Sequence, residues 1–325
     1  MNILIEKLPA NDRQRKWMAI AITVVISILL TLVGIYLIGE YGIALFVLTP
    51  FFMGLCPTIL YGLKHHITKK DAWQMGLLTL LIFTSFLLFF AIEGLICIAM
   101  AAPLAILFTW LGGLIGFAIV QKGTKRSSVI VLIFLGFIPT TAFIEKDVEH
   151  ELNSVVTSIE IKADLSTVWE NVVEFPELET PQEFIFRTGI AYPINAKIDG
   201  AGVGAIRYCN FTTGSFVEPI TVWNEPSLLK FDVLEQPAPM KEISFWDIDA
   251  PHLHDYFVSK KGQFKLTKLP NGNTLLEGTT WYYHHIKPAF YWKGWSEYII
   301  HQIHLRVLKH IKKNAEKDKL ICNIK

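Results

Sequence analysis

The pattern of hydrophobic and polar positions changes at about residue 145. Before it, a helix-length pattern predicts an N-terminal all-α transmembrane bundle over residues 1–144, because crossing a bilayer takes about 20 apolar residues. Gly112, Gly113 and Gly116 in the fourth stretch allow close helix packing. The third and fifth stretches are shorter than the others, so each is either a tilted or a re-entrant segment. The five stretches are 17–38, 41–63, 75–92, 95–120 and 129–144.

Charges in the loops predict the orientation of this bundle. The alternate loops hold Glu40 and Glu93 without Lys or Arg, and Glu93 is placed in the turn between the third and fourth stretches. By the positive-inside rule the N-terminus is cytoplasmic. Five crossings then place the remainder on the outer face of a bacterial-type inner membrane; if the fifth stretch does not cross, the remainder is cytoplasmic. The other loops carry Arg13, Arg15, Lys16, Lys64, Lys69, Lys70, Lys122, Lys125 and Arg126.

The first stretch follows basic residues, as a signal sequence does. It is too long for a cleaved apolar region and lacks a small-residue cleavage site, so we expect a retained anchor. No helix face shows a run of polar residues and no inverted repeat is visible, which makes a transporter a weak interpretation. The sequence therefore predicts a membrane platform.

After a linker at 145–152, alternating residues predict a soluble domain at 153–318, followed by a tail at 319–325. A strand at 155–161 is followed by a helix at 165–173, which Asp164 caps, and by a second short helix at 181–184. Short turns such as Asn271-Gly272 make the strands that follow antiparallel. These strands are predicted at 204–211, 216–223, 228–234, 256–267 and 274–283.

A long helix at 288–316 closes the domain. On a helical wheel its apolar residues share one broad face, which predicts packing against the sheet. The expected fold is therefore α+β, with a curved antiparallel sheet wrapped on a long C-terminal helix. An apolar cavity between sheet and helix is a natural ligand site. The residues of this face are Trp292, Ile299, Ile300, Ile303, Val307 and Ile311.

Composition narrows the functional classes. The net charge is +1 and no long basic tract exists, so we expect no nucleic-acid partner. The four cysteines have neither a disulfide framework nor a zinc spacing. We therefore predict no metal and no cofactor. The expected partners are the lipid bilayer and a hydrophobic small molecule.

The order of elements in the C-terminal half resembles the START-like helix-grip superfamily (SRPBCC), in particular its polyketide cyclase/dehydrase and lipid-transport group. The likeness extends from about residue 154 to 316, does not include the membrane half, and departs at 190–201, which we interpret as an insertion, and at 239–255. It implies a deep apolar cavity, but the superfamily includes cyclases, hydrolases, carriers and sensors. The residues that carry it are Ile159-x-Ile161-x-Ala163, Val168-Trp169, Gly202-x-Gly204-x-x-Arg207, Gly214-x-x-x-Glu218, Trp223-x-x-Pro226-x-x-Leu229-x-Phe231-x-Val233 and Gly272-x-Thr274-x-Leu276-x-Gly278.

The segment 239–255 contains the candidate catalytic residues. His252 and His254 project to one side if the segment is extended, and Asp247 or Asp249 is placed to orient one imidazole for acid–base chemistry. Two alternatives remain open: a polar surface loop whose side chains satisfy backbone groups, and a metal site. Other histidines, including His301, we expect to be satisfied or exposed.

The candidate ligand-binding residues line the predicted cavity. Arg207 and Glu218 lie on neighbouring strands, where they either anchor a polar ligand group inside the cavity or form an ordinary cross-strand pair outside it. The other candidates are aromatic or apolar, apart from one histidine on the long helix: Trp281, Tyr283, Trp295, Ile299, Ile303 and His304.

These observations predict membrane-tethered binding of a lipid-, isoprenoid- or polyketide-like ligand. The alternative is a cyclase- or dehydratase-type enzyme that uses the Asp/His segment in the same cavity. A third possibility is a sensor that signals ligand occupancy through the helices to a cytoplasmic partner. The short loops argue against it, because they expose little protein on the cytoplasmic side for a partner to bind.

Overall fold

The computed structural model describes residues 11–63, 66–123, 127–145, 151–243, 246, 248 and 250–322. Its chain forms two compact units. The first contains the helices up to residue 145 together with Ile243–Pro251 and Ile286–Pro288, and the second contains the sheet and its helices. Several predicted features lie outside the described residues: the charges of Lys64, Lys125 and Arg126, the linker residues 146–150, and the catalytic candidates Asp247 and Asp249.

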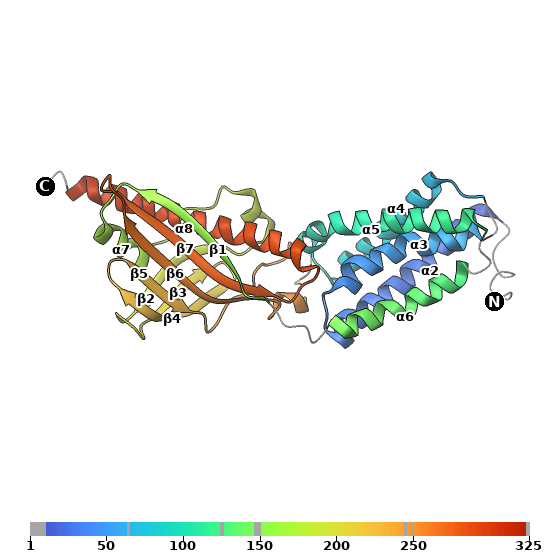
Figure 1. The fold of residues 1–325 in the computed structure, drawn as a ribbon, viewed down its shortest axis with the longest axis horizontal. Helices are drawn as coiled ribbons and strands as arrows, with labels where there is room; N and C mark the ends of the chain where they lie inside the picture. Colours follow the sequence, from blue (N-terminus) through green and yellow to red (C-terminus); the bar gives the residue numbers. More distant parts are fainter. Residues whose placement is uncertain are drawn as a thin grey trace. The chain divides into compact units, whose positions relative to one another are not determined.

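The first unit is a helical bundle (Figure 1). Between α2 and α3 the chain turns through two short π-helical segments, η1 and η2. Its elements are α2 (Asp12–Leu32), η1 (Val33–Ile38), η2 (Ala44–Leu48), α3 (Thr49–Gly62), α4 (Lys69–Phe89), α5 (Leu95–Gln121) and α6 (Ser127–Glu145).

Four helical stretches are long and apolar enough to cross a membrane: Asp12–Ile38, Ala44–Gly62, Lys69–Phe89 and Leu95–Gln121. The third is longer than predicted, because Thr68 and Asp71 form a capping box that begins the helix at polar residues. The apolar stretch of the fifth helix, Val129–Glu145 within α6, is shorter. At 1.5 Å per residue it extends about 26 Å, less than the roughly 30 Å hydrocarbon core.

Glycines allow α3 and α5 to approach closely. A Cβ atom on Gly54 would lie 1.9 Å from the carbonyl oxygen of Thr109, and one on Gly112 would lie 2.0 Å from that of Phe51. Across the same interface the Thr109 hydroxyl donates to the Pro50 carbonyl at 3.1 Å. The small residues therefore permit backbone contact that no other side chain allows.

Helix α2 carries a buried polar face. Thr23, Ser27 and Thr31 recur at every fourth residue and are at most 2% exposed. The Thr23 hydroxyl donates to the Ala19 carbonyl at 2.8 Å, which satisfies it within its own helix. The prediction that no helix face shows a run of polar residues is therefore wrong for α2. The three small hydroxyl residues of this face are separated along the sequence by apolar residues, so the run was not recognised.

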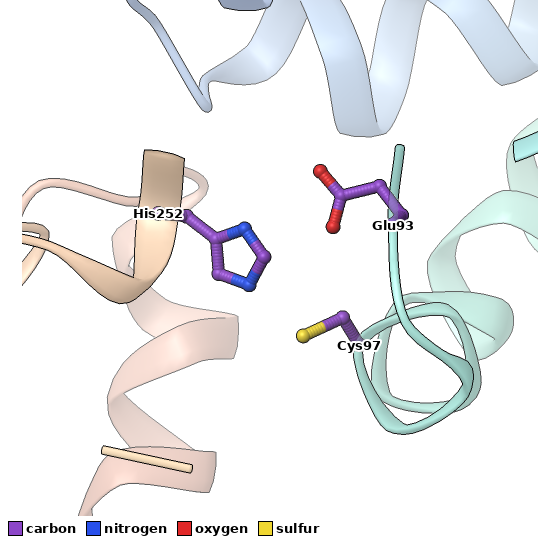
Figure 2. Close-up of side chains that lie close together, drawn as sticks. All are labelled: Glu93, Cys97 and His252. Carbon is purple, nitrogen blue, oxygen red and sulfur yellow. The ribbon is translucent and has the colours of Figure 1, made fainter. Parts of the chain in front are cut away.

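Two carboxylates of the first unit accept hydrogen bonds from the segment 41–44, between η1 and the start of η2. Glu93 lies between α4 and α5, one turn before Cys97 (Figure 2), and accepts a hydrogen bond from the Tyr41 hydroxyl at 2.8 Å. Glu145 accepts from the backbone N–H groups of Ile43 and Ala44 at 3.0 and 3.4 Å, at the start of η2. Glu93 is thus a turn residue, as the sequence predicts, and its burial is compensated by a phenol.

The second unit is a seven-stranded antiparallel sheet in the order β1-β7-β6-β5-β4-β3-β2 (Figure 1). Antiparallel pairing joins each strand to its neighbours in this order. The strands are β1 (Asn153–Ile161), β2 (Pro193–Asp199), β3 (Ile206–Phe211), β4 (Gly214–Asn224), β5 (Leu228–Asp232), β6 (Phe257–Lys268) and β7 (Thr274–His284).

Helix α8 (Ala289–Cys322) packs against the sheet, and the shorter α7 (Leu165–Val173) packs on α8. The fully buried Leu308, Ile311 and Ala315 of α8 join a core that also holds Trp169 of α7. The curved antiparallel sheet and its long C-terminal helix are the arrangement predicted for this half of the chain.

Two sequence predictions for this unit are wrong in detail. The segment 190–201 is not an insertion, because it contains β2, which pairs with β3 at the edge of the sheet. Its Pro193 and Asn195 are poor strand formers, tolerated at an edge. The short helix predicted at 181–184 is instead the 3-10 turn η3 (Phe184–Thr188).

Candidate functional site: a pocket between the sheet and the long helix

The second unit contains a pocket of about 150 Å³ between the inner face of the sheet and α8. Its walls are largely apolar, with phenylalanines from four strands on one side and isoleucines of α8 on the other. These residues meet because side chains alternate along a strand and recur every three to four residues on a helix. They are Phe211, Phe216, Phe231, Phe257, Phe264, Ile299, Ile300 and Ile303.

The volume limits what the pocket holds. A cavity of about 150 Å³ accepts a molecule such as benzene, whereas sites for drug-sized ligands measure roughly 300–1,000 Å³. The pocket in this conformation therefore matches a single ring or a short apolar segment. A larger polycyclic ligand requires the walls to move apart.

A buried ion pair forms part of the wall. Arg207 of β3 and Glu218 of β4 face each other in the strand register, and their side chains are only 2% and 8% exposed. The Arg207 Nη1 group donates to Glu218 Oε2, and its Nε donates to the Val173 carbonyl at 3.3 Å. The burial places the pair on the cavity side of the sheet, so the alternative of an outward-facing surface pair does not apply.

Three aromatic rings surround the guanidinium group. Its carbon lies 5.5–5.6 Å from the ring centroids of Phe175, Phe231 and Phe264. Rings at this distance attract a cation through their π faces. The rings and Glu218 together replace the water that Arg207 loses on burial.

Burial also controls protonation at this wall. It raises the pKa of Glu218, an effect that Arg207 opposes. Burial acts to lower the pKa of Arg207, but Glu218 and Cys209 outweigh it and raise that pKa. Burial and the charge of Glu218 raise the pKa of the nearby Cys209 thiol to about 12. Cys209 is therefore a protonated thiol at neutral pH and a poor nucleophile.

A second polar group in the wall is His304 of α8. Its Nε2 atom lies 2.8 Å from the Thr280 hydroxyl, and its Nδ1 atom lies 3.1 Å from the Thr157 hydroxyl. The same Thr157 hydroxyl lies 2.8 Å from Nδ1 of His301, one helical turn earlier and exposed. Thr157 and Thr280 come from the paired strands β1 and β7. Four side chains thus form one continuous hydrogen-bonded chain.

Acidification is expected to destabilise the second unit through His304. Burial, with a contribution from His301, lowers the pKa of His304 to about 4, whereas the unfolded chain binds this proton near pH 6.5. Stability should therefore rise with pH between about 4 and 6.5. We expect the fall in melting temperature between pH 7 and pH 5 to be smaller in His304→Gln than in the wild type. The matched control is His66→Gln, an exposed histidine of the first unit, which should retain the wild-type fall. An equal fall in all three proteins would contradict this assignment.

The structure brings together five of the predicted ligand-binding residues: Arg207, Glu218, Ile299, Ile303 and His304 line one pocket. Trp281, Tyr283 and Trp295 are not among the residues that line it. The rings of Trp281 and Tyr283 instead lie 5.1 and 5.2 Å from the ammonium groups of Lys261 and Lys260 on the neighbouring strand.

The predicted catalytic histidines, His252 and His254, do not line this pocket. His252 is buried in the 3-10 turn η4 (Pro251–Leu253; Figure 2), and His254 follows it in an exposed bend. Neither residue is part of the pocket wall described above. The acid–base role of this segment stays a prediction.

Sequence reasoning missed several wall residues. Cys209 and Phe211 were not among the candidates, although they alternate along β3 with the predicted Arg207 and line the pocket with it. That period of two was visible, but which face it covered depended on the curvature of the sheet. The threonines of the His304 chain carried no comparable signal, because threonine is common in strands.

No family model and no curated protein matches this chain. Among solved structures, it is similar to a norcoclaurine synthase mutant from Thalictrum flavum bound to a transition-state analogue, with 14% identity over 53% of this chain and 99% of that chain and a TM-score of 0.35. A structural genomics protein from Nitrosospira multiformis shows 15% identity over 51% and 99%, with a TM-score of 0.34. The Aha1 dimer from Colwellia psychrerythraea shows 14% identity over 50% and 98%, with a TM-score of 0.28. At these values the function must be argued from the pocket itself.

Proposed function

We propose that the second unit binds a small hydrophobic ligand in the pocket between its sheet and α8, and that the apolar helices hold this unit at a membrane. The observation that supports this most directly is the composition of the pocket wall, in which phenylalanine and isoleucine side chains surround a space with few polar groups. Burial of apolar ligand surface in such a space contributes roughly 25 cal/mol per Å².

The wall also indicates the charge of the ligand. Arg207 and Glu218 neutralise each other, so a charged ligand would have to compete with an existing buried pair. The part of the ligand that faces this pair is therefore neutral, with at most a weakly polar group, although the exposed Lys261 also lines the pocket. The part of the ligand inside the pocket is a single ring or a short chain, consistent with about 150 Å³.

Membrane attachment suits such a ligand. Four helical stretches have the length and hydropathy to cross a bilayer. Because apolar molecules partition into lipid, a binding unit held at the bilayer surface meets them at a higher local concentration than one in solution. Lipid-, isoprenoid- and polyketide-like molecules all fit this description.

Filling the pocket should weaken ligand binding. In full-length protein in detergent micelles, we expect Ile303→Trp to weaken the retention of a single-ring probe such as toluene at least tenfold, equivalent to about 1.4 kcal/mol. Tyr298→Trp is the matched control, because Tyr298 is 47% exposed on the same helix. Retention is measured by extraction of the purified protein and mass spectrometry, which also identifies any endogenous ligand.

Equal retention by wild type and Ile303→Trp would contradict a ligand site in this pocket. Alanine at Ile299 or Val307 provides a second comparison, since both line the wall. Each should weaken retention more than alanine at His252 or His254 does. A loss confined to the two histidine variants would instead favour the acid–base segment.

A further inference from the structure

The hydrogen-bonded chain at His304 connects the pocket to solvent. Thr280 and His304 line the pocket, Thr157 is buried at 3% exposure, and His301 is exposed on α8. The three contacts in the chain measure 2.8, 3.1 and 2.8 Å. All are within the range of hydrogen bonds between hydroxyl and imidazole groups.

The chain can be polarised in two directions without losing a hydrogen bond. In one, the Thr280 hydroxyl donates to His304 Nε2, His304 Nδ1–H donates to Thr157, and the Thr157 hydroxyl donates to His301 Nδ1. In the other, His301 Nδ1–H donates to Thr157, the Thr157 hydroxyl donates to His304 Nδ1, and His304 Nε2–H donates to Thr280. The Thr280 hydroxyl proton then points to the pocket. A neutral imidazole carries one donor and one acceptor, and a hydroxyl is both, so each arrangement keeps all three hydrogen bonds of the chain.

We propose that this chain is a proton relay, and that the pocket catalyses the shift of a proton within a neutral β,γ-unsaturated carbonyl ligand. This inference rests on the proposed function, because it requires that a ligand occupy the same pocket. The relay comprises Thr280, His304, Thr157 and His301. A carbonyl is required since only a C–H bond beside such a group is acidic enough for these bases.

The proton balance closes over one cycle. The ligand C–H bond breaks, its proton passes to Thr280 Oγ1, and its electron pair delocalises into the carbonyl group. Each relay member passes one proton onward, and His301 releases one to water. The reverse passage takes one proton from water and returns one from Thr280 to a different ligand carbon. The net reaction is an isomerisation that moves a double bond, with no oxidant or reductant.

Thr157 and His301, the half of the relay away from the pocket, prevent a positive charge from remaining on His304. Without Thr157, the abstracted proton would leave His304 as a cation, which burial in the wall disfavours. The enolate that remains carries one negative charge. Arg207 is already paired with Glu218, so Lys261, which also lines the pocket, is the cation that balances this charge until the proton returns. Passing the proton on to exposed His301 keeps His304 neutral throughout.

The test uses full-length protein in detergent micelles and the probe cyclohex-3-en-1-one, a single-ring ketone that suits the pocket volume and whose double bond moves into conjugation. Ultraviolet absorbance follows the reaction, with empty micelles as the baseline. We expect turnover above this baseline, and Thr157→Val should slow it at least about tenfold, the lower part of the range for acid–base catalysis. Binding of the probe should change little, because Thr157 is not among the pocket-lining residues.

Two variants separate a relay from a structural role. Thr157→Ser retains the hydroxyl and should restore most of the turnover, while Thr267→Val, an exposed threonine on β6, should leave it unchanged. Probe binding without turnover would overturn the relay and leave the binding function intact, as would full turnover in Thr157→Val. Failure of the wild type to bind the probe would instead contradict the proposed function, and the relay with it.

Discussion

Arg207→Met is expected to destabilise the second unit by about 3–5 kcal/mol, because it leaves the Glu218 carboxylate buried without a counter-charge. Glu218 is 6% exposed, and its partner is itself enclosed by three phenylalanine rings. Hydrogen–deuterium exchange of β3 and β4 peptides measures the loss, since 3 kcal/mol corresponds to roughly a 150-fold increase in opening.

Two comparisons make this result specific to burial. The double variant Arg207→Met with Glu218→Leu should recover most of the protection, because it removes both charges together. Lys265→Met breaks the 3.8 Å pair with Glu277, in which the Lys265 side chain is 56% exposed, and should cost no more than about 1 kcal/mol. Equal losses in Arg207→Met and Lys265→Met would show that Glu218 reaches water.

Gly54→Ala is expected to disrupt the first unit. Its new Cβ atom would lie 1.9 Å from the Thr109 carbonyl oxygen, and this neighbour is backbone that cannot rotate away. Helices α3 and α5 must therefore separate, at a cost of at least 1–3 kcal/mol for overpacking of this kind. Size-exclusion chromatography of heated, detergent-solubilised protein should show a midpoint lowered by several degrees.

The matched control is Gly136→Ala in α6, where an added Cβ atom meets nothing within 4 Å. Alanine is also the better helix former, so this variant should be neutral or slightly stabilising. If Gly54→Ala were as stable as Gly136→Ala, the close contact between α3 and α5 would not exist in the folded protein.

Local sequence signals predicted most elements well where they were strong. The α7 helix matches its predicted bounds, 165–173, and Asp164 is its N-cap residue. The Asp164 side chain makes no capping hydrogen bond to the backbone and instead accepts one from the Thr167 hydroxyl. The strand β7 begins at the predicted Thr274, after the Asn271-Gly272 turn. The edge strand β2 was missed, since an edge tolerates residues that give no strand signal.

The candidate site was only partly predictable. Arg207 and Glu218 were identified as a pair because antiparallel strands joined by a short turn place them opposite each other. The hydrogen-bonded chain through Thr157 was not predicted, because Thr157 lies 144 residues from His301 and 147 residues from His304 along the sequence. Trp281 and Tyr283 were predicted at the pocket on residue type alone, and their rings contact lysines instead.

The sequence by itself determined the division into an apolar helical half and a sheet-containing half, the antiparallel strands and the apolar face of the long helix, because these depend on patterns within about 20 neighbouring residues. Only the tertiary structure decided that β2 completes the sheet, that the Arg207–Glu218 pair is buried, and that His304 joins two strands through threonine hydroxyls. Each of these depends on how far the sheet curves around α8, and that curvature is set by packing between residues distant in the sequence.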